Sequence, residues 1–174
     1  MSKILPRNEE ITLENGRYLV SETDAKGVIT YCNDYFTQIS GYSREELIGQ
    51  QHNIIRHPDM PRVIFKLLWE RIKSGKNVNA VVKNLAKDGR YYWIFTEFKT
   101  RVDLDTNTVI GYTAHRKTIS HSAVDVISSL YAKLIEIEQK ENIQSAENYL
   151  NEFLKRKGKD INFVNLLDHI HKFY

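Results

Sequence analysis

The stretch from His52 to Pro61, which reads HNIIRHPDMP, concentrates side chains that could do chemistry. A proline fixes its own φ and keeps the preceding residue out of the helical region, so the two prolines predict a restrained loop. Such a loop can form the wall of a ligand site, with Arg56, His57 and Asp59 presented to the ligand. The alternative is a surface turn held by an Arg56–Asp59 ion pair, with His57 hydrogen-bonded to the backbone.

Metal and haem binding are further alternatives for these side chains. His52, His57 and Asp59 are metal-ligating residue types, but their spacing matches no recognised metal motif, so we expect no metal site. His57, or less favourably His52, could be the axial ligand of haem b. We find no Ser/His/Asp set, no phosphate-binding loop and no paired carboxylates, and we therefore expect a binding protein and not an enzyme.

Composition is typical of one folded domain with an appendage. The chain has 174 residues, of which 41% are hydrophobic and 27% charged, which is enough for a core. The net charge of +3, spread over scattered basic residues, argues against nucleic-acid binding. Cys32 is the only cysteine, so no disulfide can form within the chain. We see no signal peptide or membrane-spanning run and expect a cytoplasmic protein without direct membrane insertion, while association with a membrane through a partner stays open.

Short elements precede the loop and must position it. Residues 17–23 and 28–31 are β-rich runs around a turn that ends in glycine, which predicts a hairpin. Asn33 or Asp34 then caps a short helix that Gly41 ends. After the loop, apolar residues recur at helical spacing from Pro61 until Gly75, which predicts a longer helix.

Three strands follow, because the period changes to two over residues 77–86, 91–100 and 109–116. Two strands, several helices and three strands predict an α+β fold, in which a five-stranded antiparallel sheet is covered by helices on one face. Trp69 and Trp93 are expected in its core.

The C-terminal part has helical periodicity, no proline and a single glycine, Gly158. Apolar stripes run through residues 124–137, 149–154 and 163–170, with breaks predicted near Asn142 and Gly158. We therefore divide the chain into an N-terminal segment (1–14), a main domain (15–120) and a C-terminal helical segment for signalling or interaction (121–174). These helices either complete the fold or form an interface with a second copy or a partner.

Two sequence motifs resemble a known family. NDYFTQISGYSREELIG, at residues 33–49, together with the order of elements, is similar to PAS domains. HNIIRHPDMP followed by VVKNLAKDGRYYW, at residues 81–93, resembles more narrowly the FAD-binding PAS sensors of the bacterial aerotaxis receptors. The resemblance spans residues 15–120 and implies the PAS fold, with its five-stranded antiparallel sheet.

The resemblance also implies a non-covalent FAD between the sheet and the helices. The residues implied to contact it are Asn33, Arg56, His57, Asp59, Phe65 and Asn84. One position departs from the pattern, because Val78 stands where that family carries a tryptophan. Loss of this ring would weaken flavin binding, since aromatic packing contributes on the order of 1 kcal/mol beyond area burial.

The function implied by the resemblance is signal transduction. A cytosolic sensor of redox or energy state, of the aerotaxis (energy taxis) type, would signal to a separate chemotaxis receptor-like partner through residues 121–174. A homodimer through the PAS domain or the C-terminal helices stays open. Two alternatives also remain at this point, a haem-binding PAS gas sensor and a cofactor-free PAS interaction module.

Overall fold

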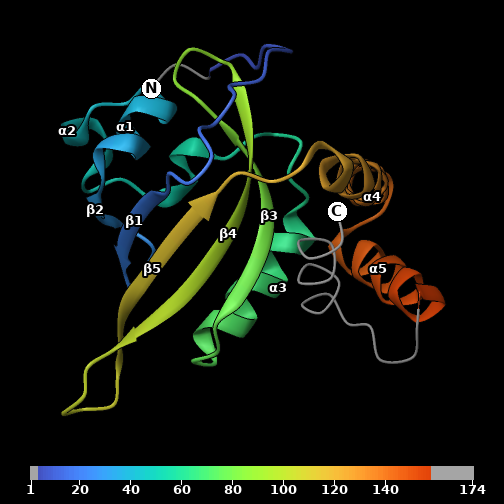
Figure 1. Ribbon diagram of the computed structural model, residues 1–174. Coiled ribbons are helices and arrows are strands. Elements are labelled where there is room, and N and C mark those ends of the chain that lie inside the picture. The colour runs from blue at the N-terminus through green and yellow to red at the C-terminus, as the bar shows by residue number, and fades with distance from the viewer. Residues whose placement is uncertain (1–3, 158–174) are drawn as a thin grey trace.

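A five-stranded antiparallel sheet with the strand order β2-β1-β5-β4-β3 is the frame of the molecule (Figure 1). The computed structural model describes residues 4–157. The strands are β1 (Leu19–Asp24), β2 (Ile29–Cys32), β3 (Val78–Leu85), β4 (Tyr91–Val102) and β5 (Val109–Lys117). The helices are α1 (Asp34–Ser40), α2 (Arg44–Leu47), the 3₁₀ helix η1 (His52–Ile55), α3 (Arg62–Lys73), α4 (His121–Lys140) and α5 (Ile143–Lys157). The predicted fold class is confirmed.

Local hydrogen bonds explain why the first elements form where the sequence predicts them. The Asp24 carboxylate accepts the backbone N–H groups of Lys26 and Val28 and so closes the β1–β2 turn. Asn33 caps α1 by accepting the N–H of Phe36 at 3.0 Å. Gly41 ends this helix with φ +72°, a left-handed conformation that glycine adopts without a steric penalty.

Helices α1, α2, η1 and α3 cover one face of the sheet, and the hydrophobic core lies between them. Its helical side includes Phe36, Leu47 and Ile64, and its sheet side includes Leu19 and Ile94, all of them buried. Burial of this apolar surface holds the helical layer on the sheet. The layer also encloses the cavity described below.

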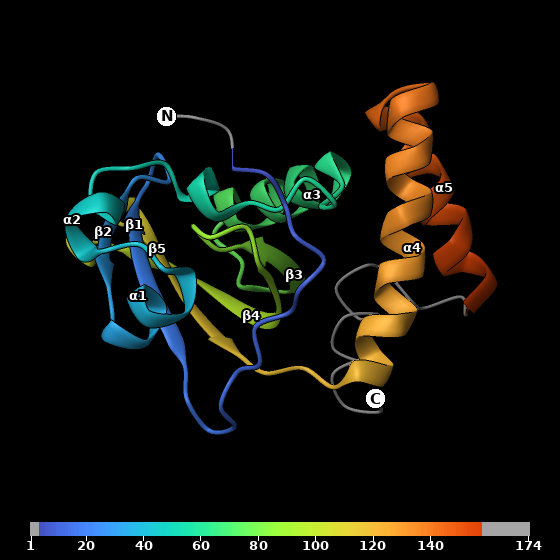
Figure 2. The same cartoon turned by 90° about the horizontal axis from the view of Figure 1, so that it is seen from above.

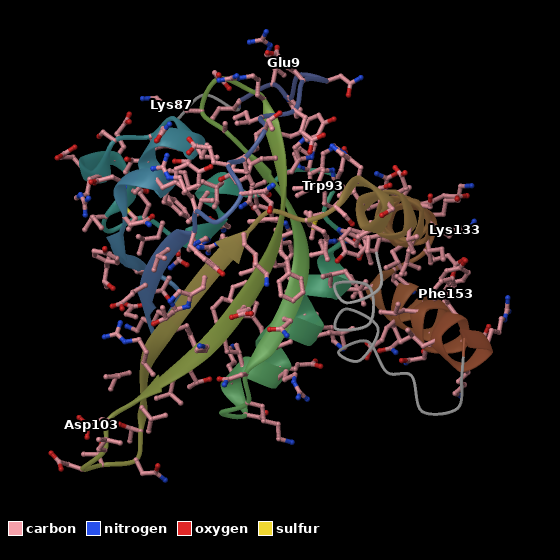
Figure 3. All side chains as sticks on the ribbon, in the orientation of Figure 1. Glu9, Lys87, Trp93, Asp103, Lys133 and Phe153 are labelled. Atoms are coloured by element: carbon pink, nitrogen blue, oxygen red, sulfur yellow. The ribbon has the colours of Figure 1, made fainter. Side chains whose placement is uncertain are left out.

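The C-terminal helices pack against the rest of the same chain. Figure 2 shows α4 running past the β3 side of the molecule toward α3, with α5 alongside it. Trp93 points to this side of the sheet (Figure 3), and its ring lies 6.3 Å from that of Tyr131 on α4. The Tyr131 hydroxyl donates to the carbonyl oxygen of Val81 at 2.8 Å. Because β3 is an edge strand, α4 covers backbone groups that would otherwise be open to pairing.

A single carboxylate of α4 caps the helix α3. Pro61 is the N-cap of α3 and offers no side-chain hydrogen bond. The buried Glu138 instead accepts the N–H of Arg62 at 3.0 Å and the N–H of Val63 at 2.7 Å. These N–H groups have no partner within the helix, so Glu138 satisfies two of the donors that every helix N-terminus leaves open.

The predicted break near Asn142 is confirmed, since α4 ends at Lys140 and α5 begins at Ile143. The break at Gly158 and the stripe 163–170 lie outside the described residues. Between residues 4 and 157, no helix is both long and apolar enough to cross a membrane.

Candidate functional site

A cavity of about 310 Å³, partly open to solvent, lies between the sheet and the helices η1 and α3. Most of its wall is apolar, with aliphatic and aromatic side chains from α3, β3, β4 and β5. Exposed Gln51 and Asn53, together with the partly exposed Trp69, line the side that opens to solvent. The Trp69 indole lies against Gly27, where an added Cβ atom would sit 3.2 Å from the ring. Trp93 is buried as predicted, whereas Trp69 is 36% exposed and forms part of this opening.

Three of the six predicted site residues line the cavity: Arg56, Phe65 and Asn84. The Arg56 guanidinium carbon lies 4.2 Å from the centre of the Phe65 ring, a cation–π contact. Nη2 of Arg56 also donates to the carbonyl oxygen of Met60 at 3.1 Å. A backbone bridge joins Arg56 to Asn84 on β3. The loop, the helix α3 and the edge strand β3 thus present these three side chains to one space.

Asn33, His57 and Asp59 do not line the cavity. The Asn33 amide is engaged by the backbone, since it accepts from Val20 N–H at 3.0 Å and donates to the Tyr18 carbonyl at 2.8 Å. These bonds tie β1 to the start of α1.

The alternative of a surface turn held by an Arg56–Asp59 ion pair is not borne out, because the Asp59 carboxylate pairs with Lys83 at 2.7 Å. His57 is 3% exposed, and its Nδ1 accepts the backbone N–H of Asp59 at 3.0 Å. This is the backbone hydrogen bond of the surface-turn alternative, whereas a contact between His57 and FAD stays a prediction. Burial, followed by the Lys83 charge, lowers the pKa of His57 to about 4, so the ring is neutral at pH 7.

The cavity is also lined by Arg116 and His52, which the sequence analysis did not include among the FAD contacts. Arg116 is 2% exposed, and it donates to Nε2 of His52 at 2.7 Å and to Oγ of Ser21 at 2.9 Å. Burial, followed by the Arg116 charge, lowers the pKa of His52 to about 3. A signal for Arg116 was present in the sequence, since period-two alternation places it on the same face of β5 as Tyr112 and Ala114.

Further polar atoms face this space. The Thr96 hydroxyl is fully buried in the cavity wall and has no hydrogen-bond partner among the described residues. Buried hydroxyls rarely stay unpaired, so this atom indicates a site for a ligand or water. Trp69 and Tyr112 meet edge to face, with ring centres 5.5 Å apart. An apolar enclosure with a few polar groups directed into it is typical of a small-molecule site.

Cys32 takes no part in this site. The thiol is buried outside the cavity lining, and burial raises its pKa. A protonated thiol is a poor nucleophile.

A five-stranded antiparallel sheet, one layer of helices and a cavity between them define a small α+β domain with an internal pocket. The family model described as the PAS fold matches residues 29–115, half of the chain. The chain belongs to the PAS family.

Curated relatives include signalling proteins. The aerotaxis receptor of Escherichia coli is 37% identical over 116 residues, which cover 67% of this chain and 22% of the receptor. The biofilm dispersion protein BdlA of Pseudomonas aeruginosa is 25% identical over 138 residues, which cover 74% of this chain and 33% of BdlA. The chain thus spans about a fifth of the receptor and a third of BdlA.

Solved structures share the fold. The light-state LOV domain of the blue-light photoreceptor Aureochrome1 superposes with a TM-score of 0.54 at 23% identity, covering 70% of this chain and 91% of that domain. A light-oxygen-voltage domain studied with a flavin analogue gives the same TM-score at 18% identity, covering 71% of this chain and 85% of that one. At these identities the likeness concerns the fold alone.

Proposed function

We propose that this chain is a non-enzymatic, cytoplasmic PAS sensor that holds FAD in the cavity and reports redox or energy state to a separate chemotaxis receptor-like partner. The observation that carries the proposal is the meeting of Arg56, Phe65 and Asn84 at one enclosed volume. These are three of the residues that the family resemblance implies. The 37% identity to the aerotaxis receptor supports the same assignment.

The cavity fits the chemistry of a flavin ring. Isoalloxazine is a flat apolar plane with an edge of carbonyl and nitrogen atoms, and Leu68, Ile72 and Val82 offer it aliphatic walls. The unpartnered Thr96 hydroxyl and the Asn84 amide can pair with the polar edge. A volume of about 310 Å³ is near the lower limit of ligand pockets, about 300 to 1,000 Å³. The ring would therefore lie inside, and the remainder of FAD would extend through the opening.

The half-buried Arg56 is suited to the part of FAD outside the ring pocket. Its guanidinium is a bidentate donor that matches diphosphate oxygens. The remaining predicted contacts, Asn33, His57 and Asp59, stay predictions. In this proposal they hold β1, α1 and the proline-rich loop in place through the hydrogen bonds described above.

Bound flavin would supply reversible electron uptake, and the protein would convert it into a change of packing. Arg56 lines the cavity and donates to the carbonyl oxygen of Met60, two residues before the start of α3. The first N–H groups of α3 bind Glu138 on α4. A redox change that moves Arg56 therefore has a short route to the C-terminal helices, whose exposed faces we assign to the partner. The redox state biases the partner only by stabilising two arrangements differently, commonly by about 1 to 3 kcal/mol.

The absorption spectrum of freshly purified protein, followed by extraction and chromatography of the cofactor, tests the proposal. We expect the visible bands of oxidised flavin and release of FAD at near-stoichiometric amounts. A Soret band would assign haem instead. A colourless protein that stays colourless after addition of FAD would refute the cofactor assignment and favour an interaction module.

Paired variants locate the flavin in the cavity. Asn84→Ala removes an amide from the cavity wall and should lower FAD retention, whereas Asn148→Ala changes an exposed amide on α5 and should not. Equal FAD content in the two variants would place the cofactor elsewhere.

A further inference from the structure

Arg116 on β5 is the most buried charged residue of the cavity lining, with 2% of its surface exposed. None of the ion pairs among residues 4–157 includes it. Burial of a charge without a counter-charge is costly, and proteins normally pair such a group. Arg116 therefore has no counter-charge among residues 4–157, although its burial calls for one.

The groups around Arg116 are neutral. It donates to Oγ of Ser21, to the carbonyl oxygen of Ala114 at 3.3 Å and to Nε2 of His52. A guanidinium only donates, so Nε2 of His52 accepts, and the proton of this neutral imidazole lies on Nδ1. The low pKa of His52 agrees with this state. Nearby Tyr92 has its pKa raised by burial, so it carries no negative charge at pH 7.

The hydrogen bonds of Arg116 also leave capacity for a ligand. A guanidinium carries five N–H groups, and these three bonds use three of them. Phe36 lies beside the guanidinium, with its ring centre 5.3 Å from Cζ, and offers it no hydrogen-bond acceptor. The unpartnered Thr96 hydroxyl belongs to the same cavity wall. The inner wall thus combines a positive charge with a spare hydroxyl.

We propose that Arg116 is the anion-recognition residue of this cavity, which selects flat apolar ligands that carry or acquire negative charge at their inner edge. The inference rests on the proposed flavin function, for which that edge is the pyrimidine part of isoalloxazine. His52 and Ser21 hold the guanidinium in position. They are positioning residues in this scheme.

For flavin, the charge matters upon reduction. Reduction of bound flavin by dithionite would transfer two electrons from the reductant, with one proton from water, and would leave one negative charge at the pyrimidine edge. A fixed guanidinium beside this edge stabilises the reduced ring more than the oxidised ring. Arg116 should therefore raise the reduction potential of the bound cofactor.

Two fluorescent probes of similar shape test the anion site without flavin. Anilinonaphthalene sulfonate is an aromatic anion, and N-phenyl-1-naphthylamine is the same ring system without the sulfonate. We expect Arg116→Gln to weaken sulfonate binding about tenfold, to leave binding of the neutral probe unchanged, and Arg116→Lys to keep the preference. Equal affinity changes for both probes would overturn the anion site. Should Arg116→Gln fail to fold, the wild-type protein decides, because stronger binding of the neutral probe contradicts the inference.

The potential of bound FAD is the second measurement, by dithionite titration against a reference dye. A tenfold loss of preference for the reduced ring lowers the potential of a two-electron couple by about 30 mV. An unchanged reduction potential in Arg116→Gln would show that Arg116 does not stabilise the reduced isoalloxazine ring. A wild-type protein that binds the sulfonate probe but no flavin would refute the proposed cofactor and leave the anion site standing.

Discussion

Glu138→Gln is the substitution with which the link between α4 and the cavity helix can be measured. The wild-type carboxylate uses both oxygens, at 3.0 Å from Arg62 N and 2.7 Å from Val63 N. Glutamine keeps the shape but has one carbonyl oxygen and one NH₂ group. Because an NH₂ group cannot accept an N–H, one of the two bonds is lost and the other loses its charge.

The magnitude follows from these two bonds. A hydrogen bond to a charged group contributes about 1.5 to 3 kcal/mol, and removal of a helix N-cap costs about 0.5 to 2 kcal/mol. Since Glu138 is only 8% exposed, water cannot fully replace it. We expect the free energy of unfolding to fall by about 2 to 3 kcal/mol, which lowers Tm by roughly 5 to 10 °C for a domain of this size.

Thermal unfolding and amide hydrogen exchange provide the assay. Exchange should accelerate first at the amides of Arg62 and Val63, because these lose their acceptor. Glu136→Gln is the matched control, since Glu136 lies on the same helix and pairs with exposed Lys133 and Lys140. If both variants unfold at the same temperature, or if exchange at the start of α3 does not change, the carboxylate does not tie α4 to α3.

Three further predictions concern pH, sheet packing and the cavity wall. The native pKa of His52, about 3, lies below the ordinary 6.5, so between these values the unfolded state binds a proton that the native state does not. The free energy of unfolding therefore decreases as the pH falls, by about 2 kcal/mol between pH 6.5 and 5. Urea unfolding at several pH values should show a smaller pH dependence of this free energy in His52→Gln. The exposed control His121→Gln should keep the pH dependence of the wild-type protein. Gly111→Ala should lower the free energy of unfolding in urea by about 1 to 3 kcal/mol, because the new Cβ would collide with the carbonyl oxygen of Thr23 on the paired strand β1. An unfolding midpoint equal to that of the wild-type protein would contradict this packing. Val78→Trp places an indole in the cavity wall. It should strengthen FAD binding about fivefold in fluorescence titration, which corresponds to roughly 1 kcal/mol of stacking. Weaker binding would mean that the indole occupies the space of the isoalloxazine ring.

The C-terminal helices show that an apolar stripe in the sequence does not identify the surface against which the helix packs. The sequence predicted amphipathic helices in this region but left open whether they complete the fold or bind another chain. Ile127, Leu134 and Leu150 are fully buried within this chain. An apolar stripe predicts that one face of a helix will be buried, and only the tertiary structure shows which residues bury it.

Much of the fold was predictable because the signals are local. Period-two alternation marked the strands, and Asn33 and Gly41 bounded α1 through bonds to residues within one turn. These interactions depend on backbone geometry over a few residues, so they can be read from the sequence alone. Short connections also favour the antiparallel pairing of β1 with β2, of β3 with β4 and of β4 with β5. The pairing of β1 with β5 joins strands far apart in the sequence, and only the structure shows it.

The sequence by itself thus determined the strands, the short helices and the PAS assignment, and it marked Arg56, Phe65 and Asn84 as site residues. Tertiary structure decided which polar groups reach the cavity. Arg116 and His52 are 64 residues apart in the chain, yet they lie 2.7 Å apart in the fold, whereas Asp59, three residues after Arg56, turns outward to Lys83. The physical reason is that burial and charge pairing depend on neighbours brought together by the sheet, and no local pattern encodes those neighbours.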